Sequence, residues 1–206
     1  MINDLFHFSS GNYIARIFEI LPTFVLPIMV INVLGAEKNA YFYIAWQISM
    51  LLHAIPRWTS MSLLAEGSYN QEEIVWNARR AMKFILILLA VAIAGIFLFG
   101  KYLLWIFGEE YARNSLDVLL ILVLGSIPFA FNVVYASVKR VQKEVKPVIW
   151  VYGGIAVITL VGSYLLARSI EIVGVGYAWV IGNGAIACGI YLKIARGEEY
   201  EKRKNI

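Results

Sequence analysis

The stretch MKFILILLAVAIAGIFLFGKYLLWIF, residues 82–107, decides the fold. No charged side chain lies between Lys83 and Lys101. A helix that crosses a bilayer needs roughly 20 mostly apolar residues at about 1.5 Å each, and this stretch exceeds that length. The sequence therefore predicts a membrane-spanning helix here.

Composition extends this prediction to the whole chain of 206 residues. Hydrophobic residues make up 60% and charged residues 16%, and the mean hydropathy is +0.70. A soluble domain is nearer half apolar and a quarter charged. The excess of apolar residues indicates an all-α polytopic transmembrane bundle. About six segments are long enough to span, and together they predict a single six-helix membrane lobe over 1–206: 13–34, 40–64, 82–107, 116–138, 148–167 and 173–194.

Polar breaks separate these segments. Residues 35–39 predict a tight polar turn, and 67–70 end the second helix. Asn70, followed by an acidic first turn, is typical of an N-cap for the third helix. Pro residues at 22, 27, 56 and 128 interrupt helices one, two and four, and two interpretations remain open. Either the kinks shape a static bundle, or the bent helices surround a cavity that opens and closes.

Lys and Arg residues alternate between the two ends of the predicted bundle. Three follow the second segment, four follow the fourth and five follow the sixth, whereas the opposite side has four in all. The positive-inside rule then places both termini in the cytoplasm of a multi-pass plasma-membrane protein. The net charge of +4 is explained by these loops, so we expect no nucleic-acid partner.

The last segment carries small residues at a spacing of four, namely Gly174, Ala178 and Gly182. This pattern is typical of a face that packs closely against another helix.

Ionisable residues inside the predicted spans concentrate in the first two helices. Such residues are costly in a bilayer and are therefore candidates for function. Glu19 and Arg57 lie at matched depths of roughly 9 and 10 Å from the cytoplasmic ends of their helices. The candidates for substrate binding are Arg57, Arg16, Gln47 and His53, and Glu19 is the candidate for ion coupling or for an ion pair. Gln47, His53 and Arg57 follow one another at helical spacing on the second helix, which predicts that they share one polar stripe.

Two interpretations of these residues stay open. In one, Glu19 and Arg57 form an ion pair within a packed seam, and Arg16 extends to the membrane surface. In the other, they line a water-filled cavity in which Arg57 binds an anionic headgroup, because its planar fork donates two hydrogen bonds to a phosphate. His53 is either a polar seam residue or a titrating group.

Enzyme chemistry has little support in the sequence. Neither an HExxH motif, a Cys/His cluster nor a Gly-rich phosphate loop is present, so we expect no catalytic residue, no metal and no cofactor. The single cysteine, Cys188, excludes an intrachain disulfide. The first residues lack a positive n-region, so we expect no cleavable signal peptide.

Several motifs resemble those of a transporter superfamily. They are NAYFYIA at 39–45, AIP at 54–56, LAEGS at 64–68, FGEEYA at 107–112, SVKRV at 137–141 and GVGYA at 174–178. On these residues the chain resembles the C-terminal six-helix half of a Wzx-type polysaccharide-biosynthesis flippase of the multidrug/oligosaccharidyl-lipid/polysaccharide exporter superfamily.

The resemblance implies a fold and a set of partners. Members have two six-helix lobes and work by alternating access, and the first two helices of each lobe line a central cavity. The expected partners are a lipid-linked oligosaccharide, membrane lipids and a second six-helix lobe in the same or a separate chain. Three functions follow: a lobe that flips a polyprenyl-pyrophosphate glycan, a multidrug or cation exporter, or a non-transporting subunit of a glycan-synthesis complex.

Overall fold

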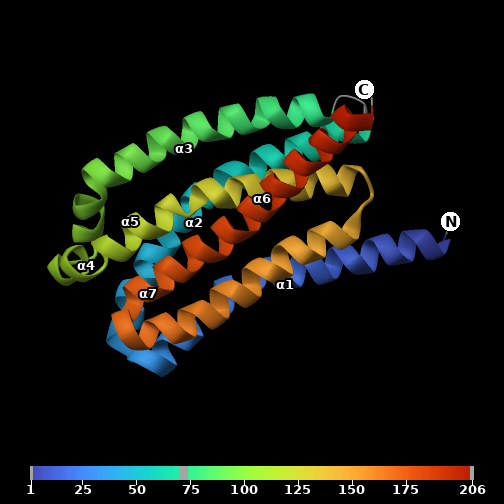
Figure 1. Ribbon diagram of the computed structural model, residues 1–206. Coiled ribbons are helices and arrows are strands. Elements are labelled where there is room, and N and C mark those ends of the chain that lie inside the picture. Colours follow the sequence, from blue (N-terminus) through green and yellow to red (C-terminus); the bar gives the residue numbers. More distant parts are fainter. Residues whose placement is uncertain (1, 70–73, 205–206) are drawn as a thin grey trace.

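The computed structural model is a bundle of helices (Figure 1). It describes residues 2–69 and 74–204, and the side chains of 8–62 and 74–197. Within these residues every regular element is a helix, as the sequence predicts. The elements are α1 (Ile2–Leu34), α2 (Ala36–Tyr69), α3 (Ile74–Trp105), α4 (Glu109–Asn114), α5 (Leu116–Leu124), α6 (Ser126–Val141) and α7 (Val145–Lys204).

The long helix α7 is two helices joined at a sharp bend. Ile170 and Glu171 leave the helical region, with φ of −133° and +53°. The chain reverses there, and the two arms of α7 run side by side (Figure 1). We call residues 145–169 the first arm and residues 172–204 the second arm. The bend lies in the polar gap that the sequence predicts between 167 and 173.

The apolar stretches agree with a membrane protein. Among the described residues, four are long and apolar enough to cross a bilayer: Phe8–Leu34, Ile74–Trp105, Leu116–Val141 and Val145–Gly197. The last is about 80 Å of helix at the standard rise, so it supplies two crossings once it bends. The helix α2 is absent from this set, because polar side chains interrupt its apolar runs. The six crossings that the sequence predicts require α2 to cross as well, and this number stays a prediction.

Several predicted boundaries were wrong in detail. The turn at 35–39 is only Gly35, at φ +92°, and the helix α2 already begins at Ala36. Glycine adopts this backbone conformation without the clash that a Cβ would cause. The fourth span is broken at Gly125 into α5 and α6, because Pro128 has no N–H to donate to the Leu124 carbonyl. The predicted N-cap at Asn70 lies outside the described residues.

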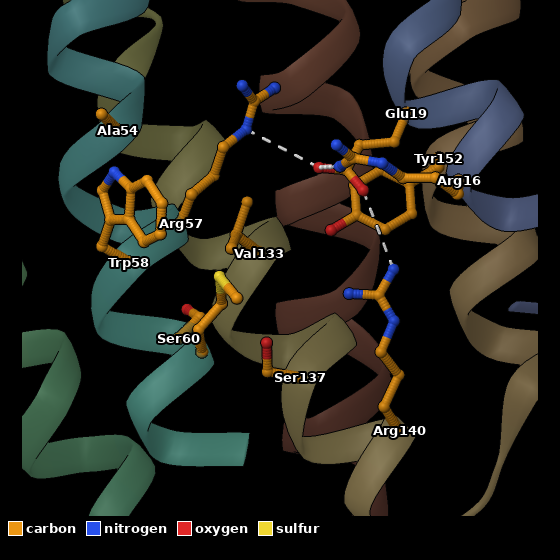
Figure 2. A pocket seen from close by; sticks show the side chains of 11 residues that line it. Arg16, Glu19, Ala54, Arg57, Trp58, Ser60, Val133, Ser137, Arg140 and Tyr152 are labelled. Atoms are coloured by element: carbon orange, nitrogen blue, oxygen red, sulfur yellow. Dashed lines mark ion pairs between the residues drawn. The ribbon is translucent and has the colours of Figure 1, made fainter. Parts of the chain in front are cut away.

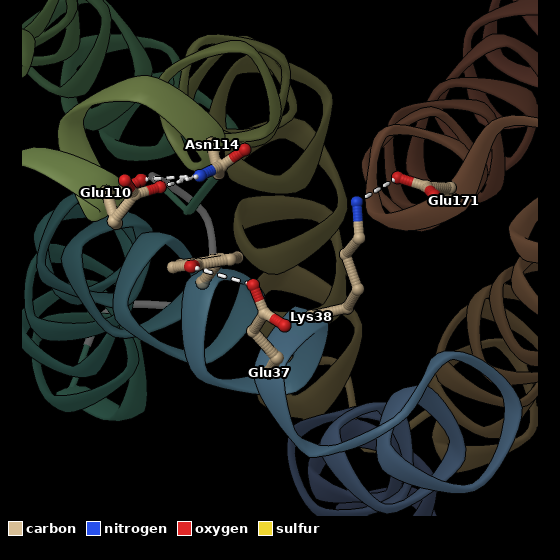
Figure 3. A network of polar contacts seen from close by, with 6 residues as sticks. Glu37, Lys38, Glu110, Asn114 and Glu171 are labelled. Atoms are coloured by element: carbon tan, nitrogen blue, oxygen red, sulfur yellow. Dashed lines mark hydrogen bonds and ion pairs between the residues drawn. The ribbon is translucent and has the colours of Figure 1, made fainter.

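The basic loops gather at one end of the bundle. Both termini, the start of α3 and the turn between α6 and α7 lie at this end, and the α1–α2 turn, α4 and the bend of α7 lie at the other (Figure 1). We call them the basic end and the opposite end. The opposite end is tied by Lys38, which pairs with Glu171 at 2.5 Å, while the Asn114 amide donates to Glu110 on α4 (Figure 3).

The small-residue face of the second arm packs on the first arm. A Cβ added to Gly182 would lie 2.4 Å from the Thr159 hydroxyl, and one added to Gly174 would lie 2.6 Å from the Leu166 carbonyl. Ala178 faces Gly162 between them. Close approach of the two arms therefore depends on small side chains along this face, as the spacing predicts.

Candidate functional site

A cavity of about 580 Å³ lies between α1, α2, α6 and the first arm of α7 (Figure 2). It contains most of the intramembrane charge that the sequence singles out. Its lining residues are Arg16, Glu19, Ala54, Arg57, Trp58, Ser60, Met61, Val133, Ser137, Arg140 and Tyr152.

Glu19 is the centre of the charged cluster. Its Oε1 lies 2.9 Å from a guanidinium nitrogen of Arg16 and 3.6 Å from Nε of Arg57, and its Oε2 lies 3.8 Å from a guanidinium nitrogen of Arg140. Figure 2 shows the carboxylate between the three guanidinium groups. The Glu19 side chain is only 6% exposed, so this carboxylate has left water and depends on the arginines for its stabilisation.

The arginines outnumber their partner. Three positive charges face one negative charge, and the side chains of Arg16, Arg57 and Arg140 remain 59%, 31% and 22% exposed. Each guanidinium has five N–H donors, and one carboxylate cannot accept from all of them. The cavity therefore has an excess of positive charge and free donors.

Aromatic rings hold two of these guanidinium groups in place. Arg57 lies over the ring of Phe129 at 5.3 Å, and Arg140 lies over the ring of Tyr152 at 5.4 Å. Stacking of this kind favours arginine over lysine, because the delocalised guanidinium plane matches the face of the ring. The two cations are thus oriented toward the cavity before any ligand enters.

The structure brings together three of the five residues that the sequence proposes. Arg16, Glu19 and Arg57 line one cavity, and the Glu19–Arg57 ion pair forms on its wall. Binding of an anionic headgroup by Arg57 stays a prediction.

Gln47 and His53 lie elsewhere. Gln47 is exposed and donates to the Tyr43 hydroxyl at 3.2 Å, and His53 is fully buried against Phe129, with ring centroids 4.6 Å apart. Gln47 and His53 are six residues apart, and six residues at about 100° each leave the second side chain about 120° away from the first around the helix axis. The expected stripe on α2 therefore does not stay on one side.

Arg140, Ser137 and Tyr152 are site residues that sequence reasoning missed. Arg140 was counted only among the basic loop residues, yet α6 extends to Val141 and turns this side chain onto the cavity. A signal was present, because Val133, Ser137 and Arg140 follow the spacing of one helix face. Among the described residues, no group of three His, Cys, Asp or Glu side chains gathers that could hold a metal ion.

Comparison with known protein families matches the MatE family over residues 13–165, three quarters of the chain. The chain belongs to the MatE family. The arginine-lined cavity of this MatE chain lies, within the described residues, between α1, α2, α6 and the first arm of α7. None of the curated proteins compared with the chain matches it.

Two solved structures share the fold of this MatE chain. One is described as the inward-facing conformation of a multidrug resistance MATE family transporter of the MOP superfamily, with a TM-score of 0.76 and 18% identity over 96% of this chain. The other is described as a crystal structure of a MATE mutant, with a TM-score of 0.77 and 19% identity over 94% of this chain. The matches cover 48% and 45% of those chains, so this chain spans about half their length.

Proposed function

We propose that this chain is one lobe of a transporter that flips a lipid-linked oligosaccharide, a glycan on a polyprenyl pyrophosphate, across the cytoplasmic membrane for polysaccharide biosynthesis. The observation that carries the proposal is the excess of arginine around Glu19 in an open cavity. A pyrophosphate is the part of such a substrate that crosses the apolar core at the greatest cost. The arginines of the cavity offer positive charge to the pyrophosphate within the membrane-spanning part of the bundle.

The geometry supports an anion in this place. The two oxygens of the Glu19 carboxylate are engaged by different arginines, Oε1 by Arg16 and Arg57 and Oε2 by Arg140. A phosphate group also offers several oxygens to guanidinium forks, and such contacts are strong because both partners are ionised. An incoming pyrophosphate would draw Arg57 and Arg140 from Glu19, and in the unloaded site the carboxylate lowers the formal charge of the cluster from three positive charges to two.

A second lobe completes the proposed transporter. The cavity is open in this chain, and the chain spans about half the length of the MATE structures that share its fold. Two lobes that rock about the shared cavity would expose it to each side in turn. The separation of basic and opposite ends in Figure 1 supports an orientation with both termini in the cytoplasm.

The alternative is a multidrug or cation exporter, and the buried carboxylate of Glu19 favours it. The surroundings of Glu19 speak against it, however. A cation exporter needs an acidic group that is free to bind its substrate, and here three arginines already surround that group. Cation-dependent dye efflux that is lost in Glu19→Gln would support this alternative. Co-purification with glycosyltransferases, without flipping in liposomes, would support a third function, a non-transporting subunit of a glycan-synthesis complex.

Export of surface glycan by the reassembled transporter tests the proposal. We expect Arg57→Gln to abolish export, because it removes a guanidinium that faces the cavity while the protein stays in the membrane. Arg113→Gln is the matched control, since Arg113 pairs with Glu109 at the opposite end and both side chains are mostly exposed. Full export by Arg57→Gln at normal protein levels would refute the role of Arg57.

A further inference from the structure

A second groove, of about 450 Å³, lies between the two arms of α7 and beside α6. It shares no lining residue with the arginine cavity. Its lining combines small and aliphatic side chains with two lysines and two aromatic residues: Tyr135, Lys146, Pro147, Trp150, Val151, Ala185, Ile186, Gly189, Ile190 and Lys193.

The charged rim of this groove is entirely basic. Lys146 lies in the first turn of α7, at the basic end, and Lys193 reaches the same groove from the second arm. Both are exposed, and in the described part of the chain neither has a carboxylate within ion-pair distance. Trp150 is 79% exposed beside them, as is typical of residues at the headgroup level of a membrane.

The apolar floor of the groove has room for a hydrocarbon chain. A Cβ added to Gly189 would meet no atom within 4 Å, so the space over this residue is open. The small residues Ala185 and Gly189 and the aliphatic residues Ile186 and Ile190 line this part of the groove from the second arm. The groove therefore presents two cations at one end and an apolar channel toward the membrane interior.

We propose that this groove binds one molecule of an anionic glycerophospholipid. The phosphate lies between Lys146 and Lys193, and one acyl chain lies over Gly189 between the arms of α7. Basic pockets between transmembrane helices recognise anionic headgroups in this way. The inference goes beyond the proposed function, because neither the glycan substrate nor the arginine cavity takes part in it.

Native mass spectrometry of the full chain tests the proposal. The protein is reconstituted in nanodiscs of phosphatidylcholine with one tenth phosphatidylglycerol, and the lipids that stay bound on release are counted. We expect one phosphatidylglycerol on the wild type. In Lys146→Gln/Lys193→Gln we expect binding about 25-fold weaker, from roughly fivefold for each basic residue near the surface.

Two controls make the result specific. Arg79→Gln/Lys83→Gln removes the same charge from exposed positions on α3 at the basic end, and we expect it to keep the bound lipid, because neither side chain lines the groove. Gly189→Leu puts a side chain into the channel at a position where an added Cβ meets no atom within 4 Å, and it should displace the lipid, whereas Gly95→Leu, where a Cβ also meets no atom within 4 Å, should retain it.

Four results would overturn the proposal. They are equal retention of phosphatidylcholine, unchanged binding in Lys146→Gln/Lys193→Gln, equal loss in the α3 control, and unchanged binding in Gly189→Leu. The last would show that no acyl chain occupies the groove.

Discussion

Glu19→Gln removes the only carboxylate that the described residues place in the arginine cavity and leaves three guanidinium groups facing one another. We expect this change to lower the free energy of unfolding and, at the same time, to strengthen the binding of a pyrophosphate. The two effects have opposite signs because the carboxylate stabilises the empty site and competes with the ligand. A residue with only a structural role would not raise ligand affinity on removal.

The size of the stability loss follows from burial. Removing one partner of a fully buried ion pair costs about 3–5 kcal/mol, and removing one from an exposed pair costs about 0–1 kcal/mol. Arg57 and Arg140 are 31% and 22% exposed, so each pair with Glu19 lies between these limits. Arg16 is 59% exposed and adds little. A total loss of about 2–3 kcal/mol follows.

Reversible unfolding in detergent, followed by circular dichroism, measures this loss. Glu109→Gln is the matched control, because the Glu109–Arg113 pair is 2.7 Å apart and about 70% exposed on both sides. The control should change stability by less than about 0.5 kcal/mol. Equal stability of the two variants would refute the claim that the buried carboxylate organises the arginines.

Pyrophosphate binding supplies the second readout. The formal charge of the cluster rises from two to three positive charges in Glu19→Gln, and we expect affinity for a polyprenyl pyrophosphate to rise about fivefold, or about 1 kcal/mol. A cation exporter predicts the reverse, namely loss of cation binding with no gain for the anion. Weaker pyrophosphate binding by a folded Glu19→Gln would contradict the anion site.

Further predictions concern packing and orientation. Gly182→Ala should lower stability by about 1–3 kcal/mol in the same unfolding assay, because its new methyl group meets a facing hydroxyl, whereas Gly184→Ala has open space and should not. A larger loss of stability in Gly184→Ala than in Gly182→Ala would contradict the packing of the two arms. In a Cys188→Ser background, an impermeant maleimide should label Asn114→Cys in intact cells and Gln142→Cys only after permeabilisation. Labelling of Gln142→Cys in intact cells would contradict cytoplasmic termini.

The spans could be predicted because the bilayer imposes a length and a composition on each. An uninterrupted apolar run such as 82–107 has one stable solution in a membrane, a helix with all its backbone hydrogen bonds made. The reversal near Glu171 also left a signal, a polar gap between two apolar runs. The break at Gly125 was harder to place, because Pro128 acts on a carbonyl four residues earlier.

The site was predicted only where charge lies within an apolar run. Glu19 and Arg57 stand out for that reason, and their matched depth indicated that they meet. Arg140 did not, because it lies among other basic residues at the end of α6 and only the packed bundle shows its direction. Gln47 and His53 were placed in the stripe by spacing alone, and the rotation of α2 sends them to other surroundings.

Direct binding to the purified chain in nanodiscs tests the central claim, that the cavity is an anion site. The measurement compares a polyprenyl pyrophosphate with the matching polyprenol and with a lipophilic cation such as tetraphenylphosphonium. We predict that the pyrophosphate binds at least about tenfold more tightly than the alcohol, a difference of about 1.4 kcal/mol, and that Arg57→Gln/Arg140→Gln removes this preference. Saturable binding of the cation, with no preference for the pyrophosphate and no effect of Arg57→Gln/Arg140→Gln, would contradict the account.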